Sequence, residues 1–98
     1  MSKRDAKKEL EAVNAVFKGL DHPTRRQILM VMHFRGDAMT AGEIAERFSC
    51  RWPTVSRHMK VLERAGLVRV EKAGRERLYR LEPNSLNVAR FWFTSFDR

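Results

Sequence analysis

Residues 40–66, TAGEIAERFSCRWPTVSRHMKVLERAG, carry the pattern that decides the fold of this chain. Thr40 and Glu43 fit the capping box S/T-x-x-E, which predicts a helix that starts directly after Thr40. Pro53 suits the first turn of a second helix, and Gly66 suits the position just past its end. Two short helices joined by a tight turn form the helix-turn-helix arrangement, whose second helix enters the major groove of DNA. This stretch therefore predicts a DNA-binding motif.

The second helix of this motif, a recognition helix expected over about residues 52–65, has an apolar side and a basic side. Val55, Met59 and Leu62 recur at helical spacing and should face the core. The first turns of such a helix contact base edges, and Arg57 can form a bidentate contact with guanine. Basic residues on an exposed helix can also serve solvation alone, so the prediction depends on the cap, the turn and the basic stripe together. The candidate DNA contacts of the motif are Thr40, Trp52, Pro53, Thr54, Ser56, Arg57 and Lys60.

The 98-residue chain has a net charge of +8 that is unevenly distributed. Residues 51–80 contain nine Lys or Arg and three Glu, so this segment carries six of the eight excess positive charges. A concentrated basic patch is typical of a protein with a polyanionic partner, and nucleic acid is the usual one. Charge alone also allows an anionic membrane surface. No basic helix here, however, has an apolar face that the core does not need.

Length and composition limit the class of protein. With 43% hydrophobic residues in 98 positions, we expect a single domain over residues 1–98. The longest apolar run is too short to cross a bilayer, and the N-terminal stretch SKRDAKKELE alternates charges, so we expect neither membrane insertion nor a secretory signal. Cys50 is the only cysteine, which excludes an internal disulfide framework and fits a reducing compartment. These observations together favour a cytoplasmic protein.

The rest of the chain predicts further helices and a hairpin around the motif. Apolar residues three or four positions apart predict helices over roughly residues 5–18 and 23–34. Residues 67–82 alternate apolar and charged side chains around a glycine, which predicts a hairpin, and Pro83 opens a last helix to about Phe96. The order helix-helix-helix-helix-strand-strand-helix is a mainly α (α+β) fold, the winged helix-turn-helix.

The hairpin over about residues 67–82 is the wing of this fold. It would flank the recognition helix and bring Lys72, Arg75 and Arg77 against the phosphate backbone or into the adjacent minor groove, whose negative potential favours arginine. The alternative is that these cations only keep an exposed hairpin soluble and block edge pairing. Their charge adds to that of the recognition helix, which favours a DNA-binding wing.

The last helix is apolar on two sides. One stripe holds Leu86, Ala89, Phe93 and Phe96, and the other holds Val88, Phe91 and Trp92. A helix of this kind must be covered on both sides, which so small a domain cannot do alone. We therefore expect a homodimer formed by the first and last helices, with a docking surface for a different protein as the alternative. The predicted dimer-interface residues are Leu10, Val13, Phe17, Val88, Phe91 and Trp92.

Dimerisation has a consequence for the DNA site. Two recognition helices related by a two-fold axis face half-sites roughly 34–36 Å apart, so we expect double-stranded DNA with an approximately palindromic operator.

Four segments together resemble a known family. They are FKGLDHPTRRQIL (residues 17–29), MTAGEIAERF (39–48), WPTVSRHMKVLERAGLV (52–68) and GRERLYRL (74–81). Over about residues 16–82 the chain is similar to the ArsR/SmtB family of bacterial dimeric winged-helix repressors. The resemblance implies a repressor of its own or a neighbouring operon that dimerises through its terminal helices. It also implies DNA contacts at the five positions from Trp52 to Arg57 named above, although Trp52 and Pro53 replace the small polar residues common there.

The same resemblance argues against metal sensing. Arsenic- and cadmium-type members carry Cys-x-Cys in the helix before the recognition helix, where AMTAGEIAERF has neither Cys nor His. Zinc-type members place Asp, His and Glu ligands on the last helix, which here offers only Asp97. His22 suits a helix cap or turn, His33 closes the second helix, and His58 faces sideways toward the core. Metal sites need several such ligands at one point, so we expect no metal and no cofactor, as in the metal-independent autorepressors.

Other functions remain as alternatives to a repressor. No catalytic pairing, nucleotide-binding glycine loop or carboxylate dyad is apparent, so we expect no enzyme. The aromatic last helix would also suit a protein-interaction module. Cys50 lies beside Arg51, and a positive neighbour can make a thiol reactive, which would suit a redox-responsive repressor. The sequence leaves open whether a protein, a small ligand or dilution relieves repression.

Overall fold

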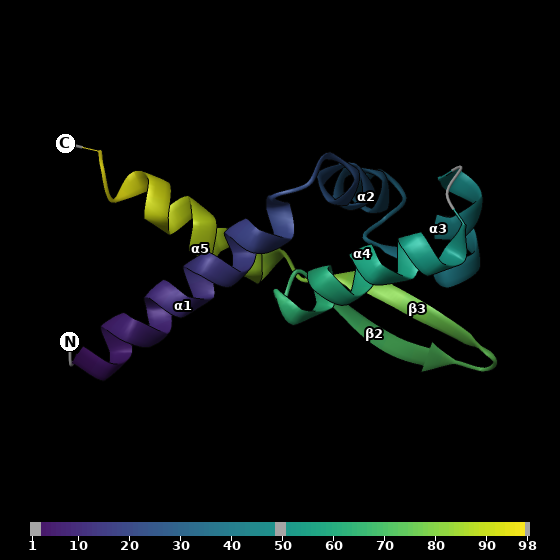
Figure 1. Ribbon diagram of the computed structural model, residues 1–98, viewed down its shortest axis with the longest axis horizontal. Coiled ribbons are helices and arrows are strands. Elements are labelled where there is room, and N and C mark those ends of the chain that lie inside the picture. Colours follow the sequence, from purple (N-terminus) through teal and green to yellow (C-terminus); the bar gives the residue numbers. More distant parts are fainter. Residues whose placement is uncertain (1–2, 49–50, 98) are drawn as a thin grey trace.

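The computed structural model describes residues 3–48 and 51–97 of the chain, and these contain five helices and a three-stranded sheet (Figure 1). In chain order the elements are α1 (Lys3–Leu20), α2 (Pro23–Phe34), β1 (Ala38–Thr40), α3 (Ala41–Arg47), α4 (Trp52–Arg64), β2 (Val68–Ala73), β3 (Glu76–Leu81) and α5 (Pro83–Thr94). The predicted order of helices and wing strands is confirmed. The short strand β1 is the one element that the sequence pattern did not predict.

Strand β1 closes the sheet on the side of β3 that β2 does not cover. The strand order is β1-β3-β2, both pairings are antiparallel, and Met39 lies opposite Tyr79. Both of these side chains are buried, so the strand anchors the base of the wing to the core. Three residues are too few to show a period of two, which is why the sequence pattern did not reveal this strand.

The two helices of the motif form as their caps predict. The N–H of Glu43 donates to Oγ1 of Thr40 at 3.1 Å, and the N–H of Thr40 donates to Oε1 of Glu43 at 3.0 Å, so both halves of the capping box are present. Pro53 lies in the first turn of α4, and Gly66 follows its end with a φ of 74°, a conformation that favours glycine.

The core lies under α4 and around α2. Val55, Met59 and Leu62 on α4 are buried, as predicted, against Ile28 and Met32 of α2. The cap of α2 is also of the predicted kind, because Nδ1 of His22 accepts the N–H of Thr24 at 3.1 Å. This packing fixes the recognition helix from behind and leaves its opposite side exposed.

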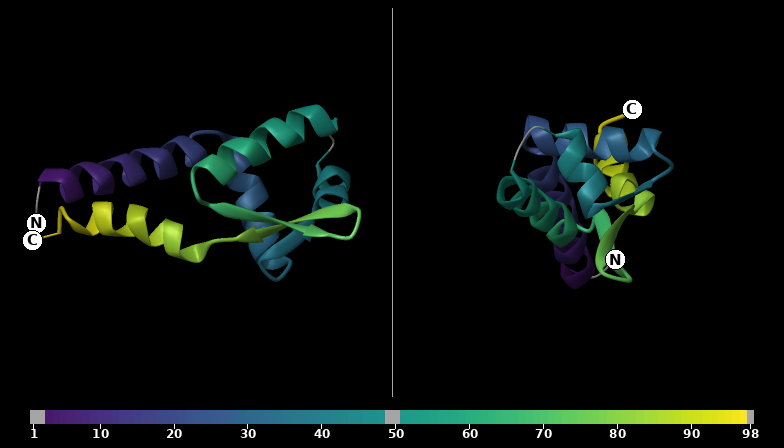
Figure 2. Two further views of the ribbon diagram at one scale, coloured as in Figure 1. Left: turned by 90° about the horizontal axis from the view of Figure 1, so that it is seen from below. Right: turned by 90° about the vertical axis from the view of Figure 1, so that its right-hand side faces the viewer.

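The molecule is elongated, with principal extents of 44 × 25 × 23 Å. Helices α1 and α5 lie side by side at one end, where both termini emerge, and α4 and the wing form the other end (Figure 2). Helix α1 meets the end of α4 closely at Gly19, because a Cβ added there would lie 2.7 Å from Cδ1 of Leu67 and 2.9 Å from Cβ of Ala65. The glycine therefore permits the contact that joins the two ends.

Helix α5 divides its side chains differently from the two predicted stripes. Ala89 of the first stripe is buried, and Val88 of the second stripe is half-buried against the core. Leu86, Phe93 and Phe96 of the first stripe are exposed. The reason is that α5 packs mainly along α1, and one helix covers only a narrow strip of another.

The predicted interface residues are also divided. Val13 is buried within the subunit, and Phe17 lies half-buried against the last helix, its ring centroid 5.3 Å from that of Trp92. Val13, Phe17 and Val88 therefore pack mainly inside the subunit, whereas Leu10, Phe91 and Trp92 are exposed. Each apolar stripe, residues 10, 13 and 17 on α1 and 88, 91 and 92 on α5, contains members of both groups. Helical spacing therefore could not tell which of these residues pack inside the subunit.

Candidate nucleic-acid interface

A groove of about 590 Å³ lies between α4 and the wing. Trp52, Ser56 and Lys60 line it from α4, and Arg75 and Arg77 line it from the wing. Its remaining lining comes from Ala41 and Gly42 at the start of α3 and from Glu76. Five of the ten predicted DNA contacts, drawn from two segments of the chain, therefore border one concave surface.

The other predicted contacts on α4 lie outside this groove and point away from the core. Pro53, Thr54 and Arg57 are exposed. On the helix, Arg57 falls on the side opposite the buried Met59. Trp52, by contrast, is half-buried against the core and forms part of the groove wall. The exposed candidates for base contact in the first turns of α4 are thus Pro53, Thr54 and Arg57.

The wing presents Lys72 and Arg77 as a directly opposed pair in the β2–β3 ladder. Both side chains are exposed, near the hairpin tip formed by Gly74 and Arg75. Gly74 has a φ of 65°, as the first turn position of a type II′ hairpin requires. The tight turn thereby holds Lys72, Arg75 and Arg77 close together at the end of the wing.

The cations of this surface are free of ion pairs. In residues 3–48 and 51–97, Arg57, Lys60, Lys72, Arg75 and Arg77 form no salt bridge with a carboxylate. These five cations outnumber Glu76, the acidic residue that lines the groove, and a net positive charge of this kind produces a field that attracts a polyanion. The arrangement therefore fits a nucleic-acid backbone.

Two carboxylates at the sheet, those of Glu71 and Glu82, instead pair with arginines away from the wing tip. Nε of Arg80 donates to Oε2 of Glu71 at 3.0 Å, and Arg69 contacts Glu71 and Glu82, each at 3.3 Å. The hydrogen bond from Arg80, followed by the charges of Arg80 and Arg69, lowers the pKa of Glu71. Glu71 and Glu82 therefore leave the charge at the wing tip unchanged, and Glu76 is the carboxylate that lies beside the cations there.

Thr40 has a structural task in addition to its predicted contact. Its hydroxyl oxygen accepts the N–H of Glu43, and its hydrogen bonds with Glu43 are the largest cause of the lowered pKa of that carboxyl. Thr40 therefore fixes the start of α3 at the edge of the groove that Ala41 and Gly42 line.

Arg25 is a positioning residue that the sequence analysis missed. Its Nε donates to the carbonyl of Gly19 at 2.8 Å and its Nη2 to the carbonyl of Lys18 at 2.9 Å, while Nη1 lies 3.4 Å from Nδ1 of His58. The ring of His58 also lies 4.5 Å from that of His22. Arg25 thus joins the end of α1 to the recognition helix; the only signal for it was its place in the motif D-x-P-T-R-R.

The environment of His58 disfavours its protonation. Burial lowers the pKa of His58, and the charges of His22 and Arg25 lower it further. His58 faces sideways from α4 toward α2, as predicted, and stays half-buried.

The structure also bears on three expectations outside the DNA-binding surface, which concern metal ligands, Cys50 and membrane-spanning helices. Within the described ranges, no three His, Cys, Asp or Glu side chains gather as a metal site would require. Cys50, the candidate redox residue, lies outside the described residues. No helix in the part of the chain that the structure describes is long and apolar enough to span a bilayer.

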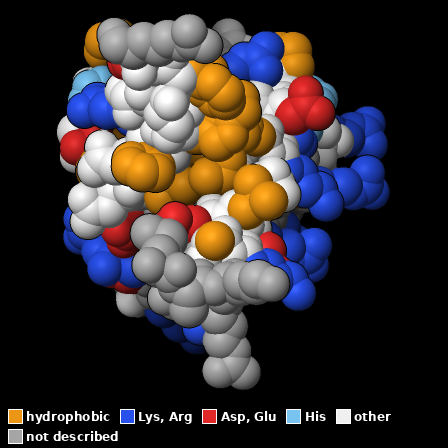
Figure 3. Space-filling view, turned by 90° about the vertical axis from the view of Figure 1, so that its left-hand side faces the viewer, with side chains coloured by type: hydrophobic (Ala, Val, Ile, Leu, Met, Phe, Trp, Pro, Cys, Tyr) orange, Lys and Arg blue, Asp and Glu red, His pale blue; other side chains and the backbone are white. Residues whose placement is uncertain are grey.

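A second surface, on α1 and α5, is apolar. Leu10, Phe91, Phe93 and Phe96 are each more than half exposed, at 55%, 66%, 59% and 68%. Figure 3, which views the end of the molecule that carries the termini, shows hydrophobic side chains gathered there. A groove of about 320 Å³ runs between the two helices, lined by Ala12, Val13, Val88 and Phe91 and by the polar Glu9, Asn84 and Asn87. We call this face the α1/α5 surface.

Comparison with known proteins relates residues 20–71 to the family model described as a helix-turn-helix domain. The chain is 36% identical over 84 residues to the transcriptional repressor SdpR of Bacillus subtilis, an alignment that covers 86% of this chain and 91% of that protein. It is therefore similar to a named repressor over nearly the full length of both.

Solved structures give the same relationship. The crystal structure of an ArsR family transcriptional regulator superposes with a TM-score of 0.78 at 32% identity, covering 87% of this chain and 86% of the other. A solution structure from Mycobacterium bovis, described as a homodimeric winged helix-turn-helix DNA-binding domain, shares the fold with a TM-score of 0.75 at 24% identity, covering 99% and 88% of the two chains.

Proposed function

Because this chain belongs to the ArsR/SmtB family of winged helix-turn-helix transcriptional repressors, we propose that it represses transcription as a homodimer on an approximately palindromic operator. The observation that carries the proposal is the groove between α4 and the wing, whose cations form no ion pair within the part of the chain that the structure describes. Such a protein acts by occupying a promoter and excluding polymerase, so its chemistry is binding alone. The similar protein SdpR is a transcriptional repressor, in line with the expectation that the chain is no enzyme.

Helix α4 reads the major groove in this proposal. Arg57 donates two hydrogen bonds to a guanine, and Thr54 lies against a thymine methyl or bonds a neighbouring base. Ser56 and Lys60, on the groove side of the helix, contact the backbone and fix the register. Trp52 and Pro53 shape the start of the helix: Trp52 packs on the core, and Pro53 occupies the first turn.

The wing contacts the flanking DNA. Lys72, Arg75 and Arg77 project from its tip, where they reach the phosphates beside the minor groove or the minor groove itself. Contacts of this kind hold the protein in place and are largely independent of sequence. Specificity therefore belongs mainly to α4 and affinity to both elements.

The α1/α5 surface joins two copies. Burying one Phe side chain is worth about 1.5–3 kcal/mol, and this surface exposes three of them together with Leu10. A second copy covers the same patch on both subunits, because a two-fold interface is self-complementary. The similar Mycobacterium bovis domain is homodimeric, which supports this arrangement. The two recognition helices then face half-sites roughly 34–36 Å apart.

Repression in this proposal needs no metal. The stretch AMTAGEIAERF (residues 38–48), which holds β1 and α3, lacks Cys and His, and α5 is followed by the carboxylate of Asp97. Several thiolate, imidazole or carboxylate groups must converge to hold a transition metal, and residues 3–48 and 51–97 contain no such group of three.

Selection of duplexes from a random pool by the purified protein tests the function. We expect enrichment of one sequence with two inverted half-sites about one helical turn apart, bound by two copies of the chain in sedimentation analysis. Failure to enrich any duplex at low salt would refute the proposal. Enrichment of a single half-site, bound by one copy, would retain DNA binding but refute the dimer.

A further inference from the structure

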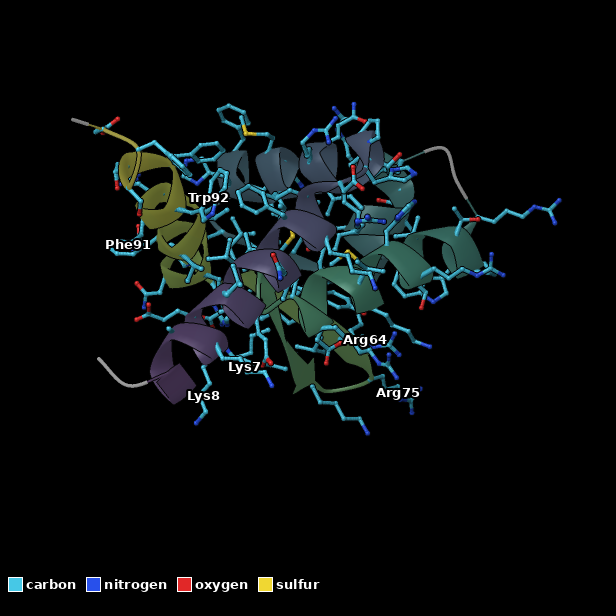
Figure 4. The ribbon with its side chains drawn as sticks, turned by 60° about the vertical axis from the view of Figure 1, so that its left-hand side comes forward. Lys7, Lys8, Arg64, Arg75, Phe91 and Trp92 are labelled. Carbon is cyan, nitrogen blue, oxygen red and sulfur yellow. The ribbon has the colours of Figure 1, made fainter. Side chains whose placement is uncertain are left out.

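Helix α1 carries two lysines on the same side of the molecule as the proposed DNA surface. Lys7 and Lys8 are exposed, and in the described residues neither forms an ion pair. Figure 4 shows their side chains projecting toward the same side as those of Arg64, at the end of α4, and Arg75, on the wing. Three elements thus direct cations to one side.

The C-terminal part of α1 is joined directly to the recognition helix. Lys18 of α1 and Arg64 of α4 border a shared groove of about 110 Å³, whose other lining residues are Ala15, Val61 and Ala65. The close contact at Gly19 and the hydrogen bonds of Arg25 hold the same junction. Since α1 is continuous from this junction to its N-terminal part, the junction sets the position of Lys7 relative to α4.

The length of that helix matches the distance that a dimer must span. Lys7 precedes Lys18 by eleven residues, which is about 16 Å along a helix at ~1.5 Å per residue. Half of the separation between half-sites is about 17 Å. Helix α1 runs away from α4 toward the end that carries the α1/α5 surface. Its N-terminal part lies at the opposite end from the wing but on the same, lower side of the molecule in Figure 1. It therefore extends from the recognition helix to the centre of the operator.

We propose that Lys7 and Lys8 bind the phosphates of the operator between its two half-sites. The inference rests on the proposed function, since only a DNA-bound dimer places α1 there. Glu11, one turn after Lys7, is also exposed and repels phosphate, so the contact belongs to the first turns of α1 and does not continue along the helix. These lysines are absent from the predicted interface because they lie far in sequence from the motif.

The test uses the duplex that the wild-type protein selects from a random pool, and two matched double variants. Lys7→Gln/Lys8→Gln removes two charges from α1, and Arg35→Gln/Arg69→Gln removes two from exposed positions that pair with Glu43, Glu71 and Glu82. Gln keeps a helix propensity close to that of Lys, so the first variant should fold. The slope of log affinity against log salt should become shallower by about 1.8, for two lost phosphate contacts, in the α1 variant only.

Two further measurements locate the contact. Neutral methylphosphonate linkages at the centre of the selected duplex should weaken wild-type binding and leave the α1 variant unaffected, whereas the same linkages at the outer ends should weaken both. Glu11→Gln should raise affinity for the unmodified duplex.

Different outcomes separate this inference from the proposed function. If the α1 variant matches the control variant in affinity and salt slope while the wild type binds its selected duplex, the inference fails and the function stands. If central methylphosphonates weaken the α1 variant as much as the wild type, the central contact belongs to other residues and the inference fails. If the wild type selects no duplex, both fail.

Discussion

Lys72 lies directly opposite Arg77 across the wing, and no carboxylate of the described residues pairs with either. A second like-charged pair, Arg69 opposite Arg80, occupies the same ladder, but Glu71 bridges both arginines. Like charges directly opposite each other destabilise a strand pair. The hairpin thus compensates one pair internally and leaves the other to be compensated by a bound anion.

Replacing Lys72 by Thr should stabilise the free protein and weaken its binding to DNA. The substitution removes the repulsion from Arg77 and adds a residue that favours strands, which should raise the free energy of unfolding by about 0.2–1 kcal/mol. Urea denaturation and a DNA titration measure the two effects. A variant that is less stable than the wild type would show that repulsion between Lys72 and Arg77 does not destabilise the hairpin.

Arg57→Ala and Arg75→Ala should weaken DNA binding in different ways. Loss of Arg57 should cost about 1–3 kcal/mol on the selected duplex and far less on random DNA, because a base contact is lost. Loss of Arg75 should weaken both duplexes alike and make the salt slope shallower by about 1, because a phosphate contact is lost. Parallel titrations compare the two variants; equal losses on both DNAs for Arg57→Ala would contradict its role in base recognition.

Phe91→Ser should convert the dimer to a monomer and lower affinity for the full operator. The side chain lies on the α1/α5 surface and lines its groove. Phe34→Ser is the matched control, since Phe34 is even more exposed, at 77%, but lies on α2. Sedimentation analysis of both variants decides the matter, and a Phe91→Ser protein that stays dimeric at micromolar concentration would place the interface elsewhere.

Thr40→Ala should cost about 1 kcal/mol of stability, the usual value of an N-cap. It removes the acceptor for the N–H of Glu43 and the side-chain hydrogen bond that helps to lower the pKa of that carboxyl, so this pKa should rise in part. The backbone N–H of residue 40, which is the largest cause of the lowered pKa, remains in the variant. Chemical denaturation and titration followed by NMR measure both changes. A variant as stable as the wild type would mean that the Thr40 cap does not stabilise α3 in solution.

Stability should fall as the pH drops below about 6.5 because of His58. Its folded-state pKa lies below the usual value, so the unfolded chain binds the proton first and acid favours unfolding. The stabilisation is complete above the unfolded pKa and is lost as the pH falls toward the folded one. Denaturation between pH 5 and 8, a range of about three units around that of histidine, should show this slope in the wild type. A His58→Gln variant with the same slope would assign it to other groups.

The motif was predictable because its signals are local. The capping box at Thr40, Pro53 in the first turn of α4 and Gly66 after its end each require only neighbouring residues, and all three lie where predicted. The hairpin tip at Gly74 is local in the same sense. The DNA contacts assigned to these elements remain predictions.

The features that the sequence did not reveal depend on distant partners. Strand β1 exists because β3 offers it an edge, and its three residues carry no period of their own. The burial of Ala89 and the exposure of Phe93 depend on where α1 lies against α5. Arg25 matters only because folding brings His58 and the end of α1 beside it. Such relations follow from packing, which a periodic pattern does not encode.

The contact at Gly19 has a consequence for the geometry of an assembled pair. Since the backbone of α1 meets Leu67 and Ala65 with no space for a methyl group, α1 cannot tilt unless the end of the recognition helix moves with it. The angle at which the terminal helices of two copies cross therefore sets the separation of their recognition helices. Any molecule that wedges those terminal helices apart would change the DNA spacing that the protein accepts, without approaching the DNA.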